Sequence, residues 1–183
     1  MLVLVGLPGS GKSTVGRQLA RRLSLPFVDS DHAIEQRLGC SIREYFEREG
    51  EDRFRDVESE VLDDLSQRSY GVLSTGGGSV LRPLNRERLK ARGQVFYLRS
   101  APEEVFRRLR HDQNRPLLQV ADPLRRLREL FDLRDPLYRE TAHHVIETGR
   151  PTVASLVNMI LGKLEASEDQ NAHFASDKPH VSS

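Results

Sequence analysis

The sequence begins with a short apolar run that leads directly into a glycine-rich loop. The run covers residues 2–5, and the loop, residues 6–13, reads GLPGSGKS, which satisfies the pattern G-x-x-x-x-G-K-[ST] of a phosphate-binding loop. Beyond it, Val15, Leu19 and Leu23 recur at helical spacing. A buried strand, a glycine-rich turn and a helix N-terminus aim backbone N–H groups and the helix dipole at one point. The sequence therefore predicts a site for the phosphates of a nucleoside triphosphate.

Composition and charge narrow the class of protein. The chain has 183 residues and one cysteine, Cys40, so no disulfide can form within it and a reducing compartment fits. No apolar run approaches the length of a membrane span, and the run that ends at Gly6 is too short for a secretory signal. The 28 basic and 27 acidic residues nearly balance, which argues against nucleic acid as a partner. We expect a monomeric cytoplasmic enzyme that binds no membrane.

Apolar strand-like segments alternate with helical patterns, which favours an α/β fold with a parallel sheet covered on both faces. One domain is expected over residues 1–165, and the polar residues 166–183 are expected to form a disordered tail. Residues 111–122 lack periodicity and are typical of a lid or of a disordered connection, and we expect a lid. The expected strands are residues 2–5, 26–28, 71–74, 94–98 and 144–147, and the expected helices include 31–38, 41–66 with a break near Gly50, 83–91, 124–138 and 151–164.

Two aspartates, Asp29 and Asp31, follow the second expected strand. Residues two apart at a strand end point the same way, so both carboxylates could face the crevice where open α/β sheets bind ligands. One could hold Mg²⁺ through a water molecule, while the other accepts a proton from an alcohol. The alternative is that Asp31 caps the next helix. Because a phosphate-binding loop precedes them, we favour the functional interpretation.

Three consecutive glycines, Gly76, Gly77 and Gly78, close the third expected strand. They cost backbone entropy and supply no packing, so either a group approaches the backbone closely there or a residue needs positive φ. A plain turn is the alternative, and the sequence leaves both interpretations open.

Three arginines are candidates for binding anions. Arg115 precedes Pro116 in the irregular segment, where a lid arginine could close over phosphates, although a solvated loop arginine is the alternative. Arg55 and Arg134 lie in helical stretches, and each could clamp a carboxylate bidentately. Since Glu58 lies at i+3 from Arg55, an ordinary ion pair on the helix surface is the alternative there.

Taken together, these motifs resemble those of the shikimate kinase family in order and spacing, over residues 1 to about 164. The motifs are residues 6–13, Asp29-Ser30-Asp31 followed by Ala33-Ile34-Glu35, Phe54-Arg55 with Glu58, Gly76-Gly77-Gly78, Arg115-Pro116-Leu117-Leu118 and Arg134-Asp135-Pro136-Leu137-Tyr138. The resemblance implies a P-loop kinase fold, with a short parallel five-stranded sheet flanked by helices and a mobile lid. It also implies ATP-dependent phosphorylation of the 3-hydroxyl of shikimate, in aromatic amino-acid biosynthesis.

The resemblance further implies roles for individual residues. Those implied for ATP binding are Gly9, Ser10, Gly11, Lys12, Ser13, Thr14, Arg108, Arg115 and Arg150. Those implied for shikimate binding are Asp31, Arg55, Gly77 and Arg134, with substrate-binding helices over residues 31–66. Lys12, Asp31 and Arg115 would be catalytic, and the cofactor Mg²⁺ would be held by Ser13 directly and by Asp29 through water.

Three other classes of protein share the phosphate-binding loop. A gluconate kinase should differ after the second strand, and a nucleoside monophosphate kinase should arrange its acceptor arginines for phosphate. A nucleotide-dependent switch needs no small-molecule acceptor, and the guanine-reading pattern N-K-x-D is absent from the sequence. Turnover that depends on an acceptor would separate the kinases from the switch.

Overall fold

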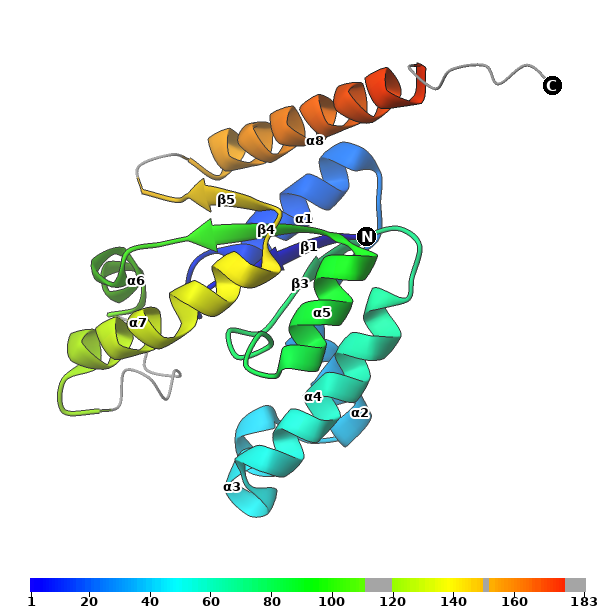
Figure 1. Ribbon diagram of the computed structural model, residues 1–183. Helices are drawn as coiled ribbons and strands as arrows, with labels where there is room; N and C mark the ends of the chain where they lie inside the picture. Colours follow the sequence, from blue (N-terminus) through cyan, green and yellow to red (C-terminus); the bar gives the residue numbers. More distant parts are fainter. Residues whose placement is uncertain (111–119, 150–151, 177–183) are drawn as a thin grey trace.

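The computed structural model describes residues 1–110, 120–149 and 152–176. Within these ranges five parallel strands form one sheet in the order β2-β3-β1-β4-β5 (Figure 1). The strands are β1 (Leu2–Val5), β2 (Phe27–Asp29), β3 (Val72–Ser74), β4 (Gln94–Arg99) and β5 (His144–Glu147). The predicted fold class, a short parallel five-stranded sheet flanked by helices, is confirmed.

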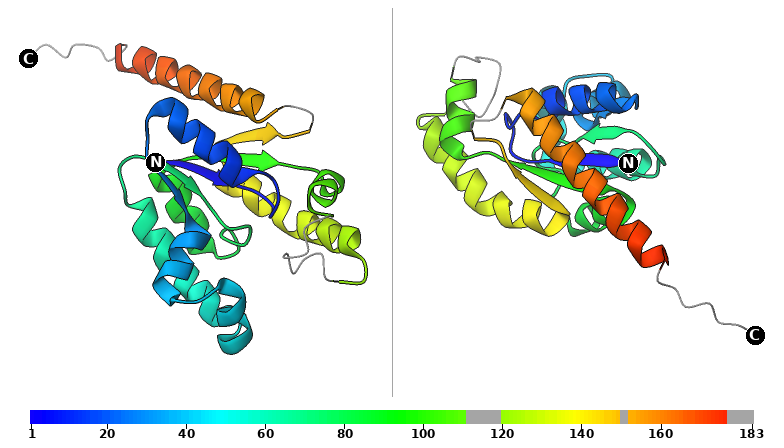
Figure 2. Two further views of the ribbon diagram at one scale, coloured as in Figure 1. Left: turned by 180° about the vertical axis from the view of Figure 1, so that it is seen from behind. Right: turned by 90° about the horizontal axis from the view of Figure 1, so that it is seen from above.

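Helices cover both faces of the sheet. They are α1 (Lys12–Leu23), α2 (Ser30–Leu38), α3 (Ile42–Glu49), α4 (Glu51–Ser66), α5 (Pro83–Arg92), α6 (Pro102–Leu109), α7 (Pro123–Thr141) and α8 (Val153–Ser176). In Figure 1, α1 and α8 lie above the sheet, while α4, α5 and α7 lie below it. The view from above in Figure 2 shows α8 crossing over the sheet next to α1.

The central strand β1 supplies side chains to both of the resulting cores. Val3 and Val5 are fully buried in the core that also contains Phe54 of α4 and Leu127 of α7. Leu4 points the other way, into the core formed with α1 and α8. This alternation explains why β1 is a continuous apolar run, since a parallel strand covered on both faces has no solvent side.

The strand order places the glycine-rich loop at the point where the connections change direction. β1 lies between β3 and β4, and the chain passes from one side of β1 to the other between these two strands. Ligands of open α/β sheets bind at such a switch point, outside the carboxyl ends of the strands. The ends of β1, β2 and β3 therefore converge on one edge.

One difference from the sequence expectations concerns the end of the chain. Helix α8 continues to Ser176, although a disordered tail was predicted from residue 166. Extending a helix that is already packed needs no new nucleation, so polar residues can continue it. The predicted lid lies mostly outside the described residues, as do Arg115 and Arg150. Among the described helices, none is long and apolar enough to cross a membrane.

Candidate active site

The loop after β1 is held in shape by its own lysine. Lys12 is 7% exposed, and its Nζ donates hydrogen bonds of 2.8 Å to the carbonyl oxygens of Gly6 and Leu7. Gly9 and Gly11 adopt left-handed φ angles of 80° and 90°, which a residue with a Cβ rarely accepts. Gly11 is also the N-cap of α1 and offers no side-chain acceptor to the first turn, so the helix N-terminus is left to an anion.

A hydroxyl and a carboxylate meet beside this loop. Ser13 Oγ donates a hydrogen bond of 2.7 Å to Asp29 Oδ2 and lies 3.3 Å from Ser74 Oγ. The other carboxylate oxygen of Asp29 accepts hydrogen bonds from the backbone N–H groups of Asp31 and His32, and so caps α2. The capping role that the sequence left open for Asp31 therefore belongs to Asp29.

The carboxyl group of Asp31 is thereby left to face the crevice. Burial raises its pKa to about 6, and the negative charges of Asp29 and Glu58 act in the same direction, while Lys12 opposes them. A carboxylate whose pKa lies near neutrality is suited to accept a proton.

Each glycine of the triplet allows a different group to approach the backbone closely. A Cβ on Gly76 would lie 2.5 Å from Asp31 Oδ1, and one on Gly77 would lie 2.5 Å from Pro8 Cδ. A Cβ on Gly78 would collide with the guanidinium group of Arg55. Residues 76–78 are not among the described residues with positive φ. The close approaches are thus present, and the chain also turns here, since the N–H of Ser79 donates a 3.1 Å hydrogen bond to the carbonyl oxygen of Gly76.

Arg55 and Glu58 form a buried ion pair. Arg55 Nη1 donates a 2.9 Å hydrogen bond to Glu58 Oε1, and the two side chains are 13% and 1% exposed. The surface pair considered from the sequence is therefore excluded. Burial raises the pKa of Glu58, opposed first by Arg55 and then by Arg134. The buried Nε of Arg55 finds no hydrogen-bond partner within the described ranges.

Arg134 reaches the same place from α7. It lines one cavity with Arg55 and Glu58, and Asp31 and Arg126 line the same cavity, so three arginines and two carboxylates surround it. One helical turn later, the hydroxyl of Tyr138 donates a 2.6 Å hydrogen bond to the carbonyl oxygen of Gly77. Helix α7 is thus attached to the loop that follows β3.

Two adjoining cavities result from this arrangement. One, of about 310 Å³, lies over the glycine-rich loop, and the other, of about 260 Å³, lies between α3, α4 and α7. Four residues line both of them: Pro8, Asp31, Gly76 and Gly77. The loop-side cavity is also lined by Gly9, Gly11, Lys12, Ser13, Thr14, Asp29 and Thr75. Asp31 therefore stands at the junction between the cavity over the glycine-rich loop and a second cavity lined by Arg55, Arg126 and Arg134.

Residues 8–165 match the family model described as shikimate kinase. The chain belongs to the shikimate kinase family. It is 63% identical over 165 residues to the shikimate kinase of Paracidovorax citrulli, covering 88% of this chain and 90% of that protein. It is 60% identical over 161 residues to the shikimate kinase of Ralstonia nicotianae, and the match covers 88% of this chain and 85% of that protein. Family members are kinases that act on an alcohol, so the chain is an ATP-dependent phosphotransferase.

Solved structures agree with this assignment. Shikimate kinase from Acinetobacter baumannii, in complex with shikimate, superimposes with a TM-score of 0.87 at 48% identity, covering 91% of this chain and 93% of that one. A gluconokinase from Sinorhizobium meliloti reaches a TM-score of 0.59 at 19% identity, covering 96% of each chain. At that identity the second likeness shows only that the fold is shared.

Arg108 lies next to the glycine-rich loop in the structure. The resemblance to shikimate kinases predicts that this arginine binds ATP. Its Nη1 lies 3.4 Å from the carbonyl oxygen of Gly9, and its Nη2 lies 3.9 Å from Glu104 Oε2. Arg115 and Arg150, assigned to the same site, lie outside the described residues.

Several residues of the second cavity were missed by sequence reasoning. They are Ile42, Phe46, Arg126 and Leu130. Ile42 and Phe46 lie four residues apart on α3, and this helical spacing is also what a core face would show. Arg126 carries no local signal, because it is one of many arginines on a helix rich in them.

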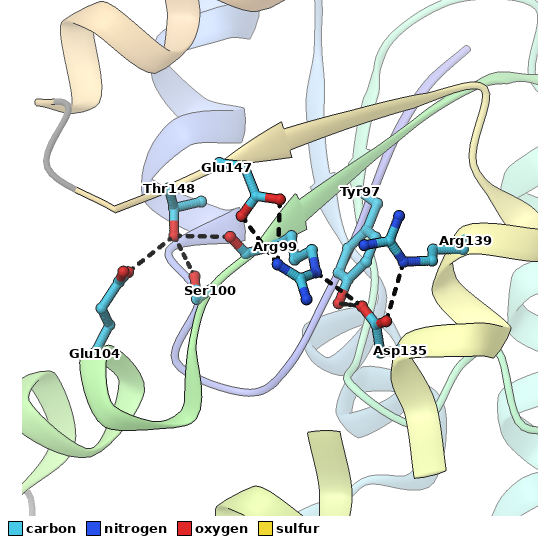
Figure 3. Close-up of polar contacts among 8 residues, drawn as sticks. All are labelled: Tyr97, Arg99, Ser100, Glu104, Asp135, Arg139, Glu147 and Thr148. Atoms are coloured by element: carbon cyan, nitrogen blue, oxygen red, sulfur yellow. Dashed lines mark hydrogen bonds and ion pairs between the residues drawn. The ribbon is translucent and has the colours of Figure 1, made fainter. Parts of the chain in front are cut away.

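Behind the second cavity, polar side chains tie α7 to the sheet (Figure 3). Asp135 accepts hydrogen bonds from Tyr97 Oη at 2.7 Å, from Arg99 Nε at 3.1 Å and from Arg139 Nε at 3.0 Å. Arg99 also pairs with Glu147 of β5. Tyr97 and Arg99 thus link α7 to β4, while Arg139 lies on α7 itself.

Proposed function

We propose that this chain transfers the γ-phosphoryl group of ATP to the 3-hydroxyl of shikimate, giving shikimate 3-phosphate and ADP. The observation that carries the proposal is the pair of adjoining cavities with Asp31 at their junction. Phosphoryl transfer needs the donor and acceptor oxygens in line, and two cavities that share four lining residues permit this.

On the nucleotide side, Lys12 and the amide groups of Gly9–Thr14 would hold the phosphates; the range 9–14 includes the N-terminus of α1. On binding, the lysine would exchange its contacts with Gly6 and Leu7 for phosphate oxygens. Arg108 would add charge from α6. Arg115 and Arg150 remain proposed contacts from the sequence.

The oxygen atoms around Ser13 fit a magnesium ion. Ser13 Oγ, Asp29 Oδ2 and Ser74 Oγ lie together, and hard oxygen donors are the ligands that Mg²⁺ prefers. The described residues contain no cluster of three or more His, Cys, Asp or Glu side chains, so water and phosphate oxygens would complete the coordination. Ser13 would hold the ion directly and Asp29 through water, and Mg²⁺ held there would offset charge on the β- and γ-phosphates.

On the acceptor side, Asp31 would orient the 3-hydroxyl and accept its proton. Its raised pKa favours that proton, and Gly76 lets its carboxylate lie against the backbone. Little base assistance is needed in a loose transition state, so alignment is the larger part of this role.

The carboxylate of the acceptor would be held by Arg55 and Arg134. Arg55 has a buried Nε–H that lacks a partner in the described part of the chain, and an acceptor carboxylate would supply one. Glu58 holds the same guanidinium from the other side at 2.9 Å. The backbone of Gly77 would contact the ring hydroxyls. A neutral acceptor would leave the Nε–H of Arg55 without a partner among the described residues and would not offset the charge of Arg134, and this provides specificity.

We propose that a single chain is the working unit, because the residues proposed to bind ATP and shikimate all belong to it. With the single Cys40 unpaired in the structure, we further propose that the protein works in the cytoplasm.

The test is ADP release by the purified protein with ATP and Mg²⁺, in the presence of shikimate, of gluconate, or of no acceptor. Release with shikimate alone, together with shikimate 3-phosphate as product, is the expected result. Equal release with gluconate or without an acceptor would overturn the assignment of the second cavity.

A further inference from the structure

Two buried tyrosines stack side by side between the sheet and α7. The rings of Tyr97 and Tyr138 have centroids 4.9 Å apart at 38°, and neither side chain is exposed. Their hydroxyl groups nevertheless have different partners. Tyr97 donates to Asp135 Oδ1 at 2.7 Å, whereas Tyr138 donates to the carbonyl oxygen of Gly77 at 2.6 Å. Only the second of these bonds reaches a residue that lines the acceptor cavity.

The bond from Tyr138 joins two distant segments of the acceptor site. Gly77 belongs to the loop after β3, 61 residues before Tyr138 in the sequence. Arg134 lies one helical turn before Tyr138 on α7, and residues at i and i+4 share a face. The tyrosine therefore fixes the glycine loop to the helix face that presents Arg134.

The hydroxyl of Tyr138 remains a donor over the whole working pH range. Burial raises its pKa to about 12, and the positive charges of Arg134 and Arg55 act against this rise. The same hydroxyl therefore lies within the field of both carboxylate-binding arginines while it holds the carbonyl group.

We propose that Tyr138 is a positioning residue that sets the distance between the Gly77 backbone and the Arg134 guanidinium group. This inference rests on the proposed function, in which these two groups contact the ring hydroxyls and the carboxylate of shikimate. A small rigid ring cannot adjust to a change in that distance. Both contacts form together only when the loop and the helix are held at one spacing, since small displacements of binding groups are costly.

The first test compares Tyr138→Phe with the matched control Tyr97→Phe. Each substitution removes one hydroxyl from a fully buried ring of the same stacked pair, so the packing is equally conserved. Asp135 keeps its two arginine partners when Tyr97 loses its hydroxyl. We expect Tyr138→Phe to raise the KM for shikimate about tenfold with the KM for ATP unchanged. Tyr97→Phe should change either KM less than about twofold.

A second test separates positioning from a general loss of structure. Acceptor analogues that each lack one ring hydroxyl are assayed with the wild-type enzyme and with Tyr138→Phe. For each acceptor, the KM of the variant is divided by the KM of the wild type, and this ratio is compared with the ratio measured for shikimate. This ratio does not depend on the fraction of folded enzyme in a preparation. The penalty of the substitution should disappear with the analogue that lacks the hydroxyl bound at Gly77. A penalty that is the same for every acceptor would overturn the inference.

A double-mutant cycle with Arg134→Ala completes the design. If Tyr138 acts through the spacing to Arg134, removing its hydroxyl in the Arg134→Ala background should raise the KM less than about threefold. A full tenfold effect in that background would contradict the proposal. Wild-type protein that fails to phosphorylate shikimate would instead refute the proposed function, so the two failures are distinguishable.

Discussion

The two cavities that meet at Asp31 are built in opposite ways. The loop-side cavity takes most of its lining from one continuous segment, residues 8–14, whose shape is maintained by local hydrogen bonds of Lys12. The acceptor cavity draws on α2, α3, α4, the loop after β3 and α7, and long-range contacts such as Tyr138 to Gly77 hold it together. Phosphate recognition is thus local in the chain, whereas acceptor recognition depends on tertiary structure.

This contrast predicts which kinetic constants respond to each substitution. The largest effect is expected at the junction, where Asp31→Asn should lower kcat about a thousandfold, because the amide neither aligns the hydroxyl group as the carboxylate does nor accepts its proton. Steady-state kinetics with both substrates measure it, and circular dichroism serves as the control for folding. Turnover close to that of wild type would remove Asp31 from the proton transfer.

Next in size is Arg134→Ala, which affects the acceptor side alone. A charge-assisted hydrogen bond is worth about 1.5–3 kcal/mol, so the KM for shikimate should rise about tenfold to a hundredfold, with the KM for ATP unchanged. Arg139→Ala is the matched control, because this arginine lies on the same helix, binds Asp135 and does not line the cavity. Equal effects of the two variants would show that α7 itself, rather than its cation in the cavity, was perturbed.

The pH dependence of kcat/KM for shikimate should follow the ionisation of the Asp31 carboxyl group. With its pKa at about 6, the carboxyl group is mostly protonated at pH 5, and kcat/KM for shikimate should be about tenfold lower there than at pH 8. The pH–rate profile measures this, with nucleotide binding followed separately. A profile that stays flat between pH 5 and 7 would contradict this assignment of the proton acceptor.

The stability contributed by Asp31 should fall as the pH rises, whereas the activity should increase. The pKa of Asp31 is higher in the folded protein than its ordinary value of 3.8, so the ionised form is favoured less by the folded state. Its contribution therefore destabilises the protein above pH 6, and this cost is relieved as the pH falls from 6 towards 4. Asp31→Asn should raise the free energy of unfolding at pH 7.5 by about 2 kcal/mol, measured by urea denaturation. A variant less stable than wild type would show that burial of the carboxylate is not costly.

The smallest effect is expected at the rim of the acceptor cavity. Arg126→Gln should raise the KM for shikimate about twofold to fivefold, since its side chain is 46% exposed and its charge is screened. Arg125→Gln is a close control, because Arg125 pairs with the same Glu129 but is 76% exposed and does not line the cavity. If added salt fails to reduce the difference between the two variants, the effect is not electrostatic.

The same contrast explains what could be predicted from the sequence. The loop was identified from eight contiguous residues, and the order of strands and helices followed from apolar periodicity. The positions of Asp29 and Asp31 were predicted, yet which of them caps α2 depended on the exact start of the helix at Ser30. A shift of one or two residues decides such a question, and periodicity does not resolve it.

The acceptor side was only partly predictable, because its residues meet through tertiary contacts. Gly76, Gly77 and Gly78 left two interpretations open until Asp31, Pro8 and Arg55 were found against them. The burial of Glu58 could not be inferred from its i+3 spacing to Arg55, since the same spacing occurs on exposed helices. Arg126 and the bond from Tyr138 to Gly77 have no local signature at all.

The shared wall of Pro8, Asp31, Gly76 and Gly77 has a consequence for inhibition. Since the two cavities share these four lining residues, we expect that one molecule can extend from one into the other. An acceptor ring joined through a short phosphate bridge to a nucleotide would bind both sites at once, and its second half would act at a high effective concentration. Because the acceptor cavity recognises a carboxylated ring, such a bisubstrate compound would bind this enzyme in preference to other enzymes that carry the same phosphate-binding loop.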